Sequence, residues 1–232
     1  MKRITNMLIL YGMICGFFLL CAKGVSDVVD TWAANEPLPR DHTIIIDAGH
    51  GGEDGGATSV SGMLESQLNL EISLRLRDLL HFLGNDTKMI RTTDTAIYTE
   101  GSSLSQKKVS DLKQRVKIVN ETPGGFLISI HQNTFPDHRY FGAQVFYGGA
   151  AGSKEFASQL QSSFATTVNP NSNRKCKAAQ GIYLMQHIQR PGVLVECGFL
   201  SNAEEEARLR SDAYQKVLCI VIAGNLNSYL AS

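Results

Sequence analysis

The stretch TIIIDAGHGGEDGGA, residues 43–57, joins a short apolar run to a glycine-rich loop. Its first part, Thr43 to Asp47, is rich in β-branched residues, which predicts a buried strand. The glycine-rich loop begins at His50. An apolar strand that leads directly into a loop carrying an imidazole indicates that this strand end contributes to a site.

Segments with strand and helix patterns alternate after this stretch. Apolar residues recur at three- and four-residue steps from Leu68 to Leu83, which predicts an amphipathic helix that ends at Gly84. Further helices are predicted over residues 104–119, 156–164, 203–210 and 218–229, and further strands over residues 87–91, 126–130, 143–148, 181–185 and 193–196. This alternation predicts an α/β fold: a single domain with a mostly parallel, twisted sheet and helices on both faces.

The first 41 residues differ from the rest. Lys2 and Arg3 precede an uncharged apolar stretch, Met7 to Ala22, and this order is typical of an export signal. Its 16 residues are slightly long for a cleaved signal and short of the ~20 that cross a bilayer. Cleavage and retention are both open, so residues 1–41 are interpreted as an export signal or membrane anchor plus linker. Residues 42–232 are then the folded domain, outside the cytoplasmic membrane.

The charges balance, with 22 basic and 22 acidic residues and no long run of either sign. Electrostatic binding of nucleic acid or of an anionic membrane is therefore not expected, and membrane contact is expected only through an uncleaved N-terminal segment. Outside that segment the cysteines are Cys176, Cys197 and Cys219. Their wide spacing and the lack of a CxxC pair favour neither a disulfide framework nor a cysteine zinc motif.

Three predicted strands lead into groups that bind metals or move protons. IIID leads to His50, FLISI to His131 and VLV to Glu196. Strand ends at one edge of an α/β sheet surround one crevice, where ligands bind. A fourth group, Glu65, begins the long predicted helix. Two histidines and one carboxylate make a three-ligand zinc set with an open fourth position, which is the catalytic pattern, and the second carboxylate is then free for proton transfer.

Each of these residues also has a simpler explanation. His50 fits a loop histidine, His131 a buried core histidine and Glu196 the partner of an arginine. A carboxylate at Glu65 is favoured by the helix dipole alone. The combination of the four residues favours a metal site. The residues are far apart in the chain, so they do not form a motif of fixed spacing.

Six blocks of sequence carry a family resemblance. They are IIIDAGHGGEDGGA, ESQLNLEISLRLRDLL, MIRTTD, LKQRVKIVN, SIHQN and VLVECGFLSN. In this order they resemble the zinc-dependent N-acetylmuramoyl-L-alanine amidases of the third amidase family. The resemblance implies a hydrolase that cuts the amide bond between the lactyl group of muramic acid and L-alanine of the peptide stem in peptidoglycan. It also implies one Zn²⁺ held by His50, Glu65 and His131, with Glu196 as the catalytic residue.

Within this family, the size, the N-terminal segment and the lack of attached wall-binding repeats resemble the germination-specific cortex amidases of spore formers. This implies a role in cortex maturation, the formation of muramic lactam for germination, and a location that includes the forespore intermembrane space. Some relatives need a protein partner to become active. No blocking helix or wall-binding module is identified here, so an activating or zinc-stabilising partner is a hypothesis.

Several roles stay open. Arg91 and Asp94 in MIRTTD follow a predicted strand, and Arg91 is a candidate for substrate binding, but a salt bridge that holds the loop explains them equally well. Asp47 is predicted either to orient a ligand histidine or simply to end its strand. The alternative functions are a zinc peptidase acting within the peptide stem, a vegetative cell-wall autolysin, and a non-catalytic wall-binding or regulatory protein.

Overall fold

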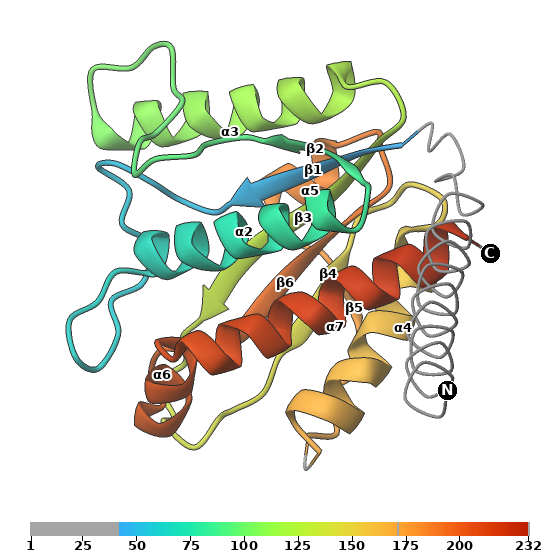
Figure 1. Ribbon diagram of the computed structural model, residues 1–232. Helices are drawn as coiled ribbons and strands as arrows, with labels where there is room; N and C mark the ends of the chain where they lie inside the picture. The colour runs from blue at the N-terminus through green and yellow to red at the C-terminus, as the bar shows by residue number, and fades with distance from the viewer. Residues whose placement is uncertain (1–41, 171, 232) are drawn as a thin grey trace, which may run out of the picture. The chain divides into compact units, whose positions relative to one another are not determined.

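A six-stranded sheet forms the centre of the domain. The computed structural model describes residues 42–170 and 172–231, so the interpretation of residues 1–41 lies outside the described residues. The strands are β1 (Thr43–Ala48), β2 (Asp86–Met89), β3 (Gly125–Asn133), β4 (Gln144–Tyr147), β5 (Lys177–Ala178) and β6 (Gly192–Phe199). Their order is β2-β1-β3-β6-β4-β5, and β4 runs antiparallel to β6 while the other neighbours are parallel. The predicted mostly parallel sheet is confirmed (Figure 1).

Helices cover both faces of this sheet, as predicted. One face packs against α2 (Glu65–Phe82), α4 (Ser153–Ser163) and α7 (Asp212–Leu230), and Figure 1 shows α2 and α7 side by side on it. The other face packs against α3 (Leu104–Glu121) and α5 (Tyr183–His187). A π-helical turn, Phe164–Val168, extends α4, and α6 (Ala203–Leu209) precedes α7. Among the described residues, no helix is both long and apolar enough to cross a membrane.

Successive side chains of β1 point to opposite faces of the sheet and pack into two different hydrophobic cores. Ile44 and Ile46 pack into the cluster beneath α2 and α7, whereas Ile45 packs into the cluster beneath α3 and α5. All three isoleucines are fully buried. Because successive strand side chains point to opposite faces, a run of β-branched residues without polar interruption fits a strand covered on both sides. The stretch quoted first therefore fits an internal strand, and β1 lies between β2 and β3.

The prediction of a strand over residues 181–185 is wrong. This segment forms α5, which begins at Tyr183, and the last strand of the sheet is the short β5, which the sequence pattern did not predict. Two neighbouring residues, Leu184 and Met185, are both buried against the second core. An edge strand with one covered face buries alternate residues, whereas a helix can bury neighbours, so the packing selects a helix here.

A buried ion-pair network ties α3 to the end of β1. The Arg115 guanidinium contacts Asp47 and Asp111, and it also donates to the backbone oxygens of Ala48 (3.0 Å) and His50 (2.8 Å). Burial by itself would raise the pKa of Asp47, but the Arg115 guanidinium and His131 hold that pKa below its usual value. The network therefore fixes the chain where the glycine-rich loop leaves the sheet.

We expect Arg115→Met to lower the free energy of unfolding by roughly 3–5 kcal/mol, because it leaves the Asp47 carboxylate buried without its partner. Since the folded-state pKa of Asp47 is depressed, this contribution is present above about pH 4 and is lost as the pH falls. Urea unfolding at neutral and acidic pH measures the effect. Arg77→Met is the matched control, since Arg77 pairs with Asp78 at the surface, where a change below about 1 kcal/mol is expected. Equal losses for both variants would contradict the prediction.

Candidate metal centre and cleft

Four predicted site residues lie at one edge of the sheet. His50 follows the end of β1, His131 lies near the end of β3, and Glu196 lies in β6. His131 and Glu196 are register partners across β3 and β6. Glu65 is the first residue of α2, which packs on β1 and β3. The parallel strands thus bring together residues that are up to 146 positions apart (50 to 196) in the chain.

Three of these side chains converge on one point. His50 Nε2 lies 3.3 Å from Glu65 Oε2, and His131 Nδ1 lies 2.9 Å from Glu65 Oε1. One ligand atom from each residue lies within 4.8 Å of the others, and the imidazole centroids are 5.0 Å apart. The arrangement is therefore a candidate metal centre, with the two imidazoles and one carboxylate predicted from the sequence.

Asp54 orients the His50 imidazole. Its Oδ2 lies 2.9 Å from His50 Nδ1, which leaves Nε2 to face Glu65. Burial alone would lower the pKa of His50, but hydrogen bonds to Asp54 and Glu65 raise it to about 9. A carboxylate on the far nitrogen of a metal-binding histidine fixes the ring and its tautomer. Lys108 of α3 pairs with the same Asp54 carboxylate at 3.1 Å.

The sequence offers Asp47 for this orienting role, but in the structure Asp54 has it. Asp47 is bonded to Arg115 and Ser129 rather than to either histidine. Asp54 is the site residue that sequence reasoning missed. The signal available was an aspartate four positions after His50 inside the glycine-rich loop, where His50 has a φ of 61°. Among the described non-glycine residues, His50 alone has a positive φ, so the loop turns sharply at this candidate ligand.

Backbone and amide donors hold the Glu65 carboxylate in place. Ala57 N–H donates to Oε2 at 2.9 Å, and Gln132 N–H and Asn69 Nδ2 donate to Oε1 at 3.1 and 3.2 Å. Burial alone would raise the pKa of Glu65, but the two neighbouring histidines depress it far below its usual value. Glu65 is therefore an ionised, preorganised carboxylate between two imidazoles. The favourable interaction of Glu65 with the dipole of α2 is the simpler explanation for a carboxylate at this position. It does not account for these hydrogen bonds or for the two imidazoles.

His131 is positioned by close packing against Gly49. A β-carbon on Gly49 would lie 2.1 Å from His131 Nε2, nearer than two such atoms approach. Only a glycine at this position leaves room for the ring. The two candidate ligand histidines are thus fixed differently, one by a carboxylate and the other by the van der Waals surface of the backbone.

We expect Gly49→Ala to weaken metal binding by at least about tenfold without removing any ligand, because the added methyl group displaces the His131 ring. A zinc competition titration against a chromophoric chelator measures the change. Gly149→Ala is the matched control, since nothing lies within 4 Å of a β-carbon there. Wild-type zinc affinity in the Gly49 variant would show that the ring position does not depend on this packing.

Glu196 lies beside the candidate metal centre, in a cleft of about 290 Å³. The cleft is also lined by His50, His131, Lys108 and Tyr183. Glu196 Oε2 is buried and has no hydrogen-bond partner within the described part of the chain. Burial raises the pKa of Glu196 to about 7, against the lowering influence of His131. A carboxyl group that titrates near neutrality and carries an unused oxygen is suited to accept and return a proton.

Arg91 lies outside the residues that line this cleft. Its guanidinium is buried and donates to the backbone oxygens of Ala48 (2.7 Å), Gly49 (3.0 Å) and Ser66 (2.8 Å). Asp94 Oδ1 accepts from Gly52 N–H at 3.1 Å. Arg91 therefore ties the end of β1 to the start of α2, and Asp94 holds the glycine-rich loop. Both act through backbone hydrogen bonds and not through the salt bridge of the alternative interpretation.

Comparisons with known proteins relate the chain to one enzyme family. The family described as N-acetylmuramoyl-L-alanine amidase (Amidase_3) matches residues 44–227. The chain is 38% identical to the germination-specific N-acetylmuramoyl-L-alanine amidase of Bacillus subtilis, over 98% of this chain and 96% of the relative.

Solved structures show the same fold. The CwlD amidase from Clostridioides difficile, determined in complex with the GerS lipoprotein, superposes with a TM-score of 0.78 at 36% identity, over 82% of this chain and 98% of that one. An N-acetylmuramoyl-L-alanine amidase from Clostridium difficile 630 superposes with a TM-score of 0.71 at 30% identity, over 83% and 98%.

Proposed function

The chain belongs to the N-acetylmuramoyl-L-alanine amidase family, and from this premise we propose that its substrate is the peptidoglycan of the spore cortex. The bond cut is the amide between the lactyl group of muramic acid and L-alanine of the peptide stem. The similarity to a germination-specific amidase along nearly the whole length of both chains supports the cortex role. Removal of stems in the cortex would serve formation of muramic lactam before germination.

The donor set at the sheet edge fits a zinc ion held by His50, Glu65 and His131. Two imidazoles and one carboxylate are common ligands of catalytic zinc, and here their ligand atoms already lie within 4.8 Å of one another. When bound there, zinc lowers the pKa of a coordinated water toward ~7 and polarises the substrate carbonyl. Asp54 and Gly49 hold the two imidazoles so that the ligand nitrogens face Glu65.

Glu196 moves the proton in this mechanism. Its carboxylate, which lines the cleft, accepts the proton of the attacking water and later returns it to the alanine nitrogen as the amide bond breaks. Burial raises the pKa of Glu196, which favours its holding a proton between the two transfers. The unpartnered carboxylate next to the three converging ligands is the single observation that carries the proposal of hydrolysis at this site.

A digest of purified cortex and vegetative peptidoglycan, with and without added zinc, tests this function. An amidase releases intact stems that begin with L-alanine, whereas a stem peptidase releases shortened stems, and mass spectrometry distinguishes them. We expect intact stems, faster release with zinc, and a preference for cortex. Shortened stems would favour the peptidase alternative, faster cutting of vegetative wall would favour an autolysin, and no turnover with zinc bound would favour a non-catalytic role.

We also infer that the enzyme works outside the cytoplasmic membrane, after export directed by the N-terminal segment, and together with an activating protein partner. The substrate lies there, and a relative 36% identical was determined in complex with a lipoprotein. A partner that stabilises the zinc site would raise zinc affinity measurably in a mixture of the two purified proteins.

A further inference from the structure

The loop between β3 and β4, residues 134–142, exposes an aromatic surface. Phe135, Tyr140 and Phe141 are 45%, 44% and 40% exposed. Among the described residues, four phenylalanine or tyrosine side chains are at least 40% exposed, and three of them lie in this loop. The fourth, Phe82, is at the far end of α2. Such a concentration on one short loop marks a binding surface rather than scattered exposure.

This loop is firmly anchored to the segment that follows β6. Phe135 N–H donates to Ser201 Oγ at 3.1 Å, Asn202 Nδ2 donates to the Tyr140 oxygen at 3.3 Å, and Gly142 N–H donates to Glu205 Oε2 at 2.8 Å. Its backbone is thus held at both ends and near the tip. The aromatic rings stay exposed although the loop that carries them is fixed.

Two of the three rings contact each other, with their planes inclined at 52°. The Phe135 and Tyr140 centroids are 4.5 Å apart. Arg174 lies 5.8 Å from the Tyr140 centroid and 4.7 Å from the Phe199 centroid, and it donates to the Phe141 backbone oxygen at 2.9 Å. We use the name aromatic platform for Phe135, Tyr140 and Phe141.

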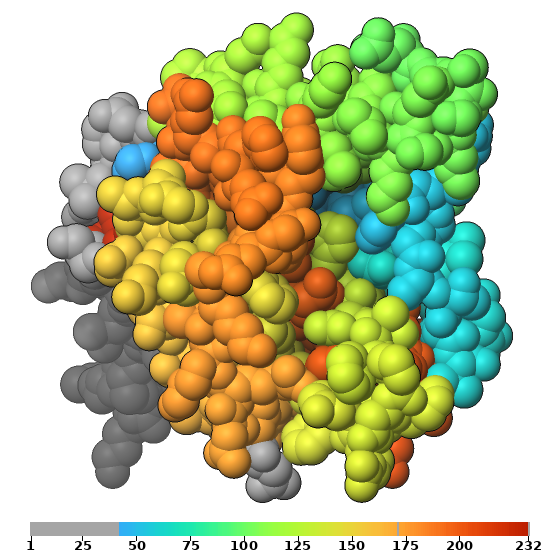
Figure 2. Space-filling view, turned by 180° about the vertical axis from the view of Figure 1, so that it is seen from behind, coloured from blue at the N-terminus to red at the C-terminus, as the bar shows by residue number. Residues whose placement is uncertain are grey.

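The loop that carries the aromatic platform lies at the same edge of the sheet as the cleft. The loop begins three residues after His131, at the sheet edge where the metal centre lies. In Figure 2 the loop is the yellow-green lobe below the central hollow, and the cleft itself is lined by α3, the glycine-rich loop, the segment around α5 and the strand ends. Two grooves flank the platform, one of about 550 Å³ along Tyr140 and Phe141 and one of about 410 Å³ between Phe135 and Val60.

We propose that the aromatic platform binds the glycan strand of the substrate as it leaves the cleft, an inference that rests on the proposed function. The muramic acid whose amide is cut belongs to a stiff polymer of pyranose rings, so neighbouring sugars must lie over the surface beside the cleft. Pyranose rings present apolar C–H faces that stack on aromatic rings, and hydroxyl groups that bond to polar neighbours such as Arg139, which is exposed at the rim. The platform offers both.

The first test measures binding of stem-free glycan strands to the zinc-loaded enzyme, which requires no amide to be cut. We expect the double variant Tyr140→Ala/Phe141→Ala to bind these strands roughly five- to tenfold more weakly than the wild type. Phe82→Ala is the control, because it removes an exposed aromatic ring far from the cleft, and it should bind normally. Equal binding by the wild type and the double variant would overturn the proposal, even if the enzyme is an active amidase.

The second test compares hydrolysis of polymeric stem-bearing strands with hydrolysis of a single muramoyl peptide. We expect the double variant to show a higher KM on the polymer and unchanged kcat/KM on the small substrate. Equal losses on both substrates would place the effect in the catalytic site and overturn the proposal. A loss that appears only when a partner protein is present would assign the platform to protein docking instead. Failure of the wild type to cut either substrate would refute the proposed function while the binding result still stands.

Discussion

Glu196→Gln is expected to lower amide hydrolysis by roughly 10²- to 10⁴-fold while zinc content stays at the wild-type level. The change keeps the size of the side chain and removes its ability to take a proton. Because Glu196 is not one of the three converging ligands, the metal centre itself is left intact. Turnover of a muramoyl peptide and metal analysis of the same preparation measure the two quantities together.

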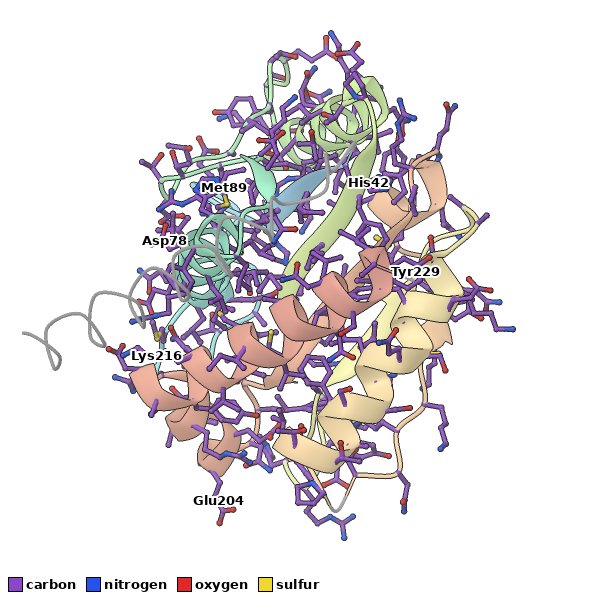
Figure 3. The ribbon with its side chains drawn as sticks, turned by 45° about the vertical axis from the view of Figure 1, so that its right-hand side comes forward. His42, Asp78, Met89, Glu204, Lys216 and Tyr229 are labelled. Atoms are coloured by element: carbon purple, nitrogen blue, oxygen red, sulfur yellow. The ribbon has the colours of Figure 1, made fainter. Side chains whose placement is uncertain are left out.

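Glu204→Gln is the matched control for this variant. Glu204 lies on α6, where Figure 3 shows its side chain directed away from the body of the domain. It should change neither activity nor zinc content. Full hydrolysis by the Glu196 variant would remove the proton-transfer role, and loss of zinc from it would mean that Glu196 acts as a ligand.

The sequence predicted the parts of the fold that local patterns determine. The isoleucines of β1 and the three- and four-residue steps of α2 have strong periodicities, and both elements occur where they were expected. The same patterns place His50 and His131 at the ends of strands. That these ends meet follows from the rule that parallel strands carry their ligands at one edge.

The remaining features depend on tertiary packing, which periodicity does not report. Residues 181–185 read as a strand, yet α5 forms because Leu184 and Met185 both find a core to fill. The role of Gly49 appears only once the His131 ring lies against it. In the sequence, Asp54 looks like any loop aspartate. Its contact with His50 Nδ1 arises because the turn at His50 brings the two side chains together. Each depends on contacts between segments that are distant in sequence or sharply turned.

His131→Ala is expected to weaken zinc binding by more than about 100-fold, beyond the 10- to 100-fold loss typical of residues that only orient a ligand. The reason lies in the geometry: Glu65 would keep one imidazole partner instead of two, and His50 Nε2 and a single carboxylate would form an incomplete set. At zinc concentrations that fully activate the wild-type enzyme, hydrolysis by the His131 variant should fall to background. Zinc competition titration and turnover measured over a range of zinc concentrations check both statements.

The pattern of losses separates this variant from Glu196→Gln, because the histidine variant loses metal and activity together whereas the glutamate variant loses activity alone. His81→Ala is the matched control. His81 is exposed on α2, so this variant should bind zinc normally.

The His131 variant also frees space beside Gly49, so Gly49→Ala should have no further effect on zinc affinity in that background. Wild-type zinc affinity in His131→Ala would refute the assignment of the metal centre, and an additive effect of Gly49→Ala would show that the glycine acts on something other than this ring.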